Sequence, residues 1–146
     1  MASSIYFFEP AAASARERLL ATGLIVLTLT ALVYLRLFNP ATTGLFPPCP
    51  FRFLTGLNCP GCGTLRGLHQ LLHGHPINAL DLNPLLILGL PFMLYIFLSY
   101  ALVALRGRGL PKAFIPSPLI WVMFWVIISF WVLRNVPLYP FTLLAP

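Results

Sequence analysis

The sequence predicts an all-α integral membrane protein with three transmembrane helices and a short amphipathic interfacial or re-entrant helix between the first and second. Three observations support this fold class. The 146-residue chain is 59% hydrophobic and only 8% charged, whereas typical globular chains carry about 25% charged residues. Three apolar segments approach the length that a membrane-crossing helix needs. A loop rich in cysteine, histidine, glycine and proline separates the first two, and the whole chain is expected to form a single membrane domain, residues 1–146.

The composition also excludes several classes of protein. Three acidic residues cannot cover a water-facing surface, and so high an apolar content excludes an intrinsically disordered chain. The net charge of +6 comes from scattered arginines, so no nucleic-acid partner is expected. The chain offers no paired carboxylates, no Ser-His-Asp order and no phosphate-binding glycine loop, which argues against a hydrolase.

The first predicted span covers residues 19–38, which carry no charge before Arg36. A helix of this length reaches about 30 Å, the thickness of a hydrocarbon core. Pro40 ends it, because a proline ring disfavours helical geometry at the preceding residue. A cleaved signal peptide is the alternative, but the apolar run is longer than a usual signal core and no small-residue cleavage pattern follows it. We therefore expect a retained helix.

The second and third predicted spans cover residues 84–105 and 118–134. Each begins with a polar residue followed by proline, at Asn83 and at Ser117. An asparagine side chain accepts a hydrogen bond from an otherwise unpaired N–H at a helix N-terminus, and a proline at the first position has no N–H to satisfy. Both dipeptides therefore predict helix starts.

The positive charges near the span ends predict the orientation in the membrane. One side receives five positive residues, Arg16, Arg18, Arg106, Arg108 and Lys112, and the other side receives four arginines. Because cytoplasmic loops carry an excess of lysine and arginine, we expect the N-terminus in the cytoplasm and the long central loop on the outer face.

That loop, residues 39–83, holds all three cysteines and all three histidines. After its last cysteine the pattern becomes helical, and Thr64 is the expected N-cap of a short helix that runs to His73 and is closed by Gly74. Its leucines fall on one face and its polar residues on the other. The helix is too short to span, so we expect it to lie in the membrane interface or to dip back into the bundle.

The loop has a specific order of residues: Cys-Pro, then Thr-Gly-Leu-x-Cys-Pro-Gly-Cys-Gly-Thr-x-Arg, then Asn-Pro. This order resembles a family of small bacterial multi-pass membrane proteins catalogued only as a domain of unknown function, from the first cysteine to the middle of the second span. The matching positions are Cys49, Pro50, Gly56, Cys59, Pro60, Cys62, Gly63, Arg66 and Pro84. The resemblance implies a compact protein of the bacterial cell (inner) membrane, and it implies no reaction, substrate or cofactor.

The first interpretation of the cysteines is a metal site. Cys59 and Cys62 have the spacing of a zinc knuckle, in which a tight turn aims two thiolates at one ion. Cys49 is the candidate third ligand and His69 the fourth, provided that Cys62 lies in the turn before the short helix, since seven helical residues span about 10 Å. His69 and His73, one turn apart, are alternatively ligands of a second metal or a haem, although solvated histidines are commoner on a polar face.

The second interpretation is thiol–disulfide exchange, with Cys59 and Cys62 as the catalytic pair and Cys49 as the exchange partner. A helix N-terminus lowers a thiol pKa, and Arg66 would add to that effect. An outer location is oxidising, where such exchange is useful. No thioredoxin-like βαβ pattern surrounds the motif, which argues against this interpretation.

The third interpretation is structural. A disulfide from Cys59 to one of the other two cysteines, or three buried thiols, would fix a loop whose glycines and prolines set its path. Arg66 would then be a buried anchor that pairs with Asp81 or with loop carbonyls, because charge in or near a membrane is usually partnered.

These interpretations lead to one leading function and two alternatives. We predict a non-enzymatic accessory or assembly module whose loop around Cys49, Cys59, Cys62 and Arg66 is a structural or metal-binding site, with zinc as the candidate ion. The alternatives are a membrane thiol–disulfide oxidoreductase and the handling of haem or another cofactor through the two histidines of the short helix. The expected partners are the lipid bilayer and a membrane protein, which includes a second copy of the chain.

Overall fold

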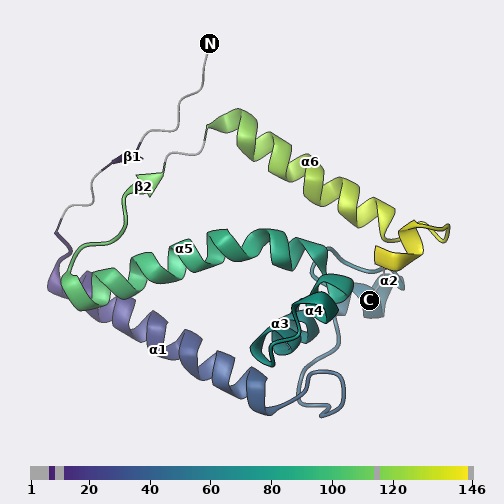
Figure 1. The fold of residues 1–146 in the computed structure, drawn as a ribbon, viewed down its shortest axis with the longest axis horizontal. Helices are drawn as coiled ribbons and strands as arrows, with labels where there is room; N and C mark the ends of the chain where they lie inside the picture. The colour runs from purple at the N-terminus through teal and green to yellow at the C-terminus, as the bar shows by residue number, and fades with distance from the viewer. Residues whose placement is uncertain (1–6, 9–11, 114–115, 145–146) are drawn as a thin grey trace. The chain divides into compact units, whose positions relative to one another are not determined.

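The structure is a computed structural model that describes residues 7–8, 12–113 and 116–144. Within these residues the strands are confined to one antiparallel pair of two residues each, so the predicted all-helical class is confirmed apart from this short pairing. In chain order the elements are β1 (Phe7–Phe8), α1 (Ala15–Leu37), α2 (Pro50–Thr55), α3 (Thr64–Leu72), α4 (Pro76–Leu82), α5 (Pro84–Arg106), β2 (Lys112–Ala113), α6 (Ser117–Leu133) and the 3-10 helix η1 (Phe141–Leu144) (Figure 1).

Two of the helices are long and apolar enough to cross a membrane. Helices α1 and α5 have 23 residues each, with mean hydropathies of 1.9 and 2.2 over their most apolar windows. A helix of this length reaches about 35 Å. Helix α6 is also apolar but has only 17 residues. The structure therefore supports two membrane-spanning candidates and a shorter apolar helix, while the third span stays a prediction.

Helix α1 begins four residues before the predicted span because of a capping box. The Glu17 carboxylate accepts a bond from the Ser14 backbone N–H at 2.7 Å, and the Ser14 hydroxyl accepts one from the Glu17 N–H at 3.3 Å. This reciprocal pair satisfies two N–H groups that a helix start otherwise leaves unpaired. The Ser-x-x-Glu pattern is present in the sequence. The predicted start was based on hydropathy, however, and the apolar run begins only after this pattern.

The start of α5 is confirmed at the predicted residue. Asn83 Oδ1 accepts a hydrogen bond from the Leu85 N–H at 3.0 Å, and Pro84 takes the first helical position. The helix continues through Pro91 to Arg106, one residue beyond the predicted span.

The central loop contains more helix than the sequence predicted. Helix α3 is confirmed, but its N-cap is Gly63, at φ 87°, and not Thr64. Helices α2 and α4 were not predicted, although each starts with proline and α2 ends at Gly56 with φ 74°. Helices of six and seven residues are too short for a hydrophobic period to reveal them, so only their end signals were available.

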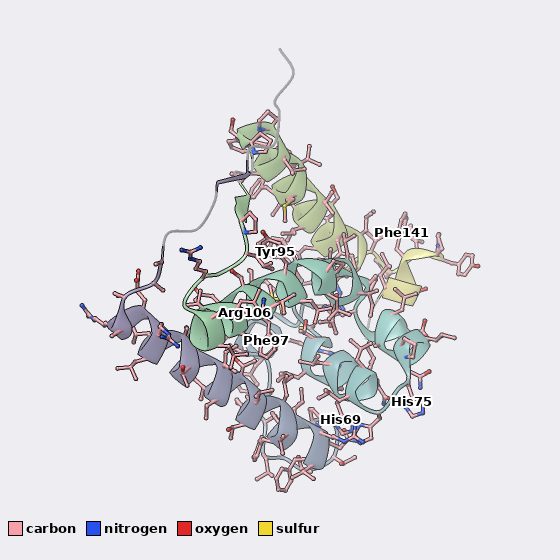
Figure 2. The ribbon with its side chains drawn as sticks, turned by 60° about the vertical axis from the view of Figure 1, so that its left-hand side comes forward. His69, His75, Tyr95, Phe97, Arg106 and Phe141 are labelled. Carbon is pink, nitrogen blue, oxygen red and sulfur yellow. The ribbon has the colours of Figure 1, made fainter. Side chains whose placement is uncertain are left out.

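The chain divides into two compact units, residues 1–31 with 90–122 and residues 32–89 with 123–146. The prediction of one membrane domain is not tested by this division. In the first unit, the Leu110 N–H donates to the Ser99 hydroxyl at 3.1 Å, and the Tyr95 hydroxyl donates to the Pro111 carbonyl (Figure 2). These contacts hold the segment after α5 against that helix.

The second unit contains the central loop and all three cysteines. Within it, α3 and α4 pack side by side (Figure 1). A Cβ added at Gly67 would lie 3.0 Å from Leu86 Cδ2 and 3.3 Å from the Ala79 carbonyl oxygen. Glycine avoids this crowding, and Ala79, which faces it, is completely buried. The close packing places the start of α5 against the turn that carries the cysteines.

Candidate metal centre

The three cysteines that the sequence singled out come together in the second unit. Their Sγ atoms all lie within 4.8 Å of one another. Cys59 Sγ is 3.4 Å from Cys49 Sγ and 3.1 Å from Cys62 Sγ. All three are free thiols, and Cys62 is the most buried of them, with 6% of its surface exposed. The cluster therefore has three soft sulfur donors around one point.

Local structure explains how each sulfur reaches this point. Cys49 is the N-cap of α2. Cys59 and Cys62 lie in a turn, in which the Cys62 N–H donates to the Cys59 carbonyl at 3.1 Å. Gly63, in the left-handed region, then starts α3. Cys62 therefore lies in the turn before the short helix, as a shared metal site requires.

The pKa values of two of the thiols move in opposite directions. The Arg52 backbone N–H, and then the neighbouring Cys59 thiol, lower the pKa of Cys49. Burial, together with the hydrogen bonds that Cys59 shares with Cys62 and Cys49, raises the pKa of Cys59 from 9.0 to about 11. In the metal-free cluster, Cys49 therefore ionises at a lower pH than Cys59.

This asymmetry predicts an order of reaction with an alkylating agent. Only a thiolate is alkylated quickly, so Cys49 of the metal-free protein should react at a lower pH than an ordinary thiol. Cys59 should lag until the pH approaches about 11. Iodoacetamide labelling across a pH series, mapped by peptide mass spectrometry, measures this order, and the denatured chain is the control in which the difference disappears. Faster labelling of Cys59 at neutral pH would contradict it.

A buried arginine is hydrogen-bonded to the cysteine turn. Arg134, only 2% exposed, donates through Nη1 to the carbonyls of Cys59 at 3.0 Å and Pro60 at 3.2 Å. Its Nη2 donates to the carbonyl of Cys62 at 3.2 Å. Its guanidinium carbon also lies 4.9 Å from the centre of the Phe130 ring. This residue was not among the predicted site residues.

Asn83 also forms hydrogen bonds with the cysteine turn. Its Nδ2 donates to the Pro60 carbonyl at 3.1 Å, to the Thr64 hydroxyl at 2.9 Å and, more weakly, to the Cys62 carbonyl at 3.4 Å. The residue is 1% exposed. The sequence predicted its capping role alone, and the structure adds that one side chain joins the start of α5 to the cysteine turn.

The structure places the predicted arginine anchor differently. Arg66 is half-buried in α3 and Asp81 is exposed in α4, and no ion pair joins them. The loop carbonyls are instead held by Arg134. Arg66 does not anchor the loop, because α3 directs its side chain toward a cavity beside the cluster.

The structure does not bring His69 to the three sulfurs. Its Nδ1 donates to the Leu35 carbonyl at the end of α1, 2.7 Å away (Figure 2). The His73 ring lies next to it, with ring centres 4.3 Å apart, and its Nδ1 donates to the His69 carbonyl. The His69 side chain is therefore directed at the end of α1. A haem or second metal at this pair stays a prediction.

No curated protein and no solved structure matches the chain. A family model does match part of it, and that part begins at the first cysteine and ends within α5. It includes the three cysteines, both unpredicted short helices and Asn83, and it leaves out α1 and Arg134. This is the extent expected from the motif in the loop. Residues 49–97 thus match the family described as "Protein of unknown function (DUF2752)".

Proposed function

We propose that the chain is a small, non-enzymatic membrane module whose Cys49, Cys59 and Cys62 thiolates bind one soft metal ion such as zinc. The observation that carries this proposal is the gathering of three Sγ atoms within 4.8 Å. Zinc binds thiolates at about 2.3 Å, so two sulfurs of a tetrahedral site lie about 3.8 Å apart. The separations of 3.1 and 3.4 Å are within about 1 Å of that value, and small side-chain rotations reach it.

Positive charge near the cluster supports the binding of thiolates. The guanidinium of Arg134 lies within electrostatic range of both Cys59 and Cys62. In addition, the Cys59 N–H donates to Cys62 Sγ at 3.2 Å. Donors and positive charge favour the ionised sulfur that a metal requires.

The module is proposed to act from the bacterial inner membrane as an accessory or assembly protein. Support comes from α1 and α5, which are long enough to cross, and from the apolar α6, which would be the third span. The distribution of positive residues favours a cytoplasmic N-terminus and a cysteine cluster on the outer face. A membrane protein or a second copy of the chain is the proposed partner.

The test combines metal content with thiol labelling of the native protein in detergent. We expect about one zinc ion per chain, and three thiols that react with maleimide only after a chelator is added, because a metal-bound thiolate is not free to attack. Adding a reductant without chelator should release none. Absence of metal, together with three thiols that react at once, would contradict the proposal.

Cysteine variants make the same test specific to the cluster. Cys59→Ser and Cys62→Ser should each lose most of the bound zinc, since a hydroxyl is a poor zinc ligand. Cys49→His is the matched control at the third position, because imidazole keeps a zinc ligand there, and it should retain more metal than Cys49→Ser. Equal zinc content in all four variants and the unaltered chain would place the ion elsewhere.

A second candidate function is thiol–disulfide exchange, which the opposite pKa directions of Cys49 and Cys59 favour. The Cys49 thiolate would attack a disulfide of a substrate protein, and one substrate sulfur would leave as a thiolate. A second thiolate of the cluster would then attack Cys49 Sγ and release the other substrate sulfur. Two electrons pass from the chain to the substrate, and the chain keeps a disulfide. In the labelling test, this function predicts two thiols that appear only after reduction.

A further inference from the structure

A cavity of about 430 Å³ lies beside the cysteine cluster, entirely within the second unit. Cavities of this size hold small organic molecules. Cys49 and Cys62 form part of its lining, as do Arg52 and Arg66. Prolines and a phenylalanine of the segment before α2 also line it, together with Leu65 and two glycines of the cysteine turn.

The two arginines of the cavity have no partner in the described part of the chain. Neither Arg52 nor Arg66 forms a hydrogen bond or an ion pair through its guanidinium there, whereas Arg134 donates three hydrogen bonds to the turn. Both lie within electrostatic range of Arg134. Three positive charges thus surround the cluster, and the one acidic residue of the second unit, Asp81, is exposed on α4. A divalent ion with three thiolates carries a single negative charge, so positive charge remains in excess.

Among the residues that the structure describes, no fourth protein ligand joins the three cysteines. Three cysteines come together, and His69 is bonded to the end of α1 instead. A zinc site with three protein ligands keeps its fourth position for water or an exogenous molecule. Two of the three ligand residues, Cys49 and Cys62, line the cavity, so a molecule bound there would lie next to the metal.

We propose that the cavity binds an exogenous oxyanion, a carboxylate or phosphate group, that pairs with Arg52 and Arg66 and supplies the fourth ligand of the metal. Guanidinium groups bind such anions through paired N–H donors, and the bond is strongest where the group has no competing partner. The inference rests on the proposed metal function, since the anion completes the coordination of that ion. The proposed ligand of the cavity is therefore an anionic small molecule or a lipid headgroup.

The test uses the cobalt(II)-substituted protein in detergent, because the visible bands of cobalt bound to thiolates change with the fourth ligand. Titration with inorganic phosphate, and separately with acetate, should produce a saturable change in these bands. Arg52→Gln and Arg66→Gln should each weaken the anion affinity about tenfold, the loss expected for one charge-assisted hydrogen bond. Arg66→Lys, which keeps the charge, should lose less. Arg108→Gln is the matched control, since this exposed arginine does not line the cavity, and it should bind anions normally.

The outcomes separate this inference from the function on which it rests. If the protein binds no cobalt, the metal function fails. If cobalt binds with thiolate bands that no anion alters, the metal function stands and the oxyanion site is wrong. Equal effects of Arg108→Gln and Arg66→Gln would also overturn the site. Nanodiscs identify the source of the anion: the same spectral change in phosphatidic acid, and not in phosphatidylcholine, assigns a lipid headgroup, and its absence in both assigns a soluble oxyanion.

Discussion

Arg134→Leu is expected to destabilise the protein by about 3 kcal/mol and to weaken zinc binding 10- to 100-fold. The side chain is 2% exposed and donates three hydrogen bonds to carbonyls of the cysteine turn. Leucine fills similar space but leaves these carbonyls without their charged donor. The turn then no longer holds Cys59 and Cys62 at their present separation.

Thermal unfolding in detergent and zinc competition against a chelator measure the two effects. Arg134→Lys separates charge from geometry, because an ammonium keeps the charge but cannot reach three carbonyls in the fork arrangement of a guanidinium. It should recover only part of the loss. Arg16→Leu is the matched control, since Arg16 is exposed in the first turn of α1. If Arg134→Leu unfolds and binds zinc like Arg16→Leu, the turn does not depend on the arginine.

Asn83→Ala is expected to have the second largest effect, also about 3 kcal/mol. It removes the cap of α5 and the donors to the Pro60 carbonyl and the Thr64 hydroxyl. Asn83→Asp separates these roles, because its carboxylate still accepts from the Leu85 N–H but offers no donor to the turn. The aspartate variant should therefore remain destabilised. Wild-type stability in Asn83→Asp would show that capping is the main contribution.

The two residues are expected to act together, because they share acceptors. The carbonyls of Pro60 and Cys62 each accept from both Arg134 and Asn83. After one substitution each carbonyl keeps one donor, and after both it has neither. The double variant should therefore lose about 1 kcal/mol more than the sum of the single variants. Additive losses in a thermodynamic cycle would show that the two supports are independent.

The helical part of the fold could be predicted because its signals are local. A long apolar segment that enters lipid forms a helix, since its backbone groups find no water there and must form internal hydrogen bonds. The start of α5 at Asn83-Pro84 was also predictable, because the cap and the proline act on adjacent residues. The short helices α2 and α4 were missed for the opposite reason. Tertiary packing stabilises α4, as at Gly67, and six or seven residues are too few for either helix to show a periodic pattern.

The candidate site was predicted only in part, for the same physical reason. The Cys59–Cys62 turn follows from proline and glycine spacing within four residues, and the sequence therefore determined its form and its two sulfurs. The long-range partners were decided by the tertiary structure, since Arg134 lies 72 to 75 residues from the carbonyls that it holds. Contacts at such separations depend on how helices pack and not on any local pattern. Packing also directed His69 to the end of α1 and left Arg66 at the cavity, although the sequence placed both residues on the right helix.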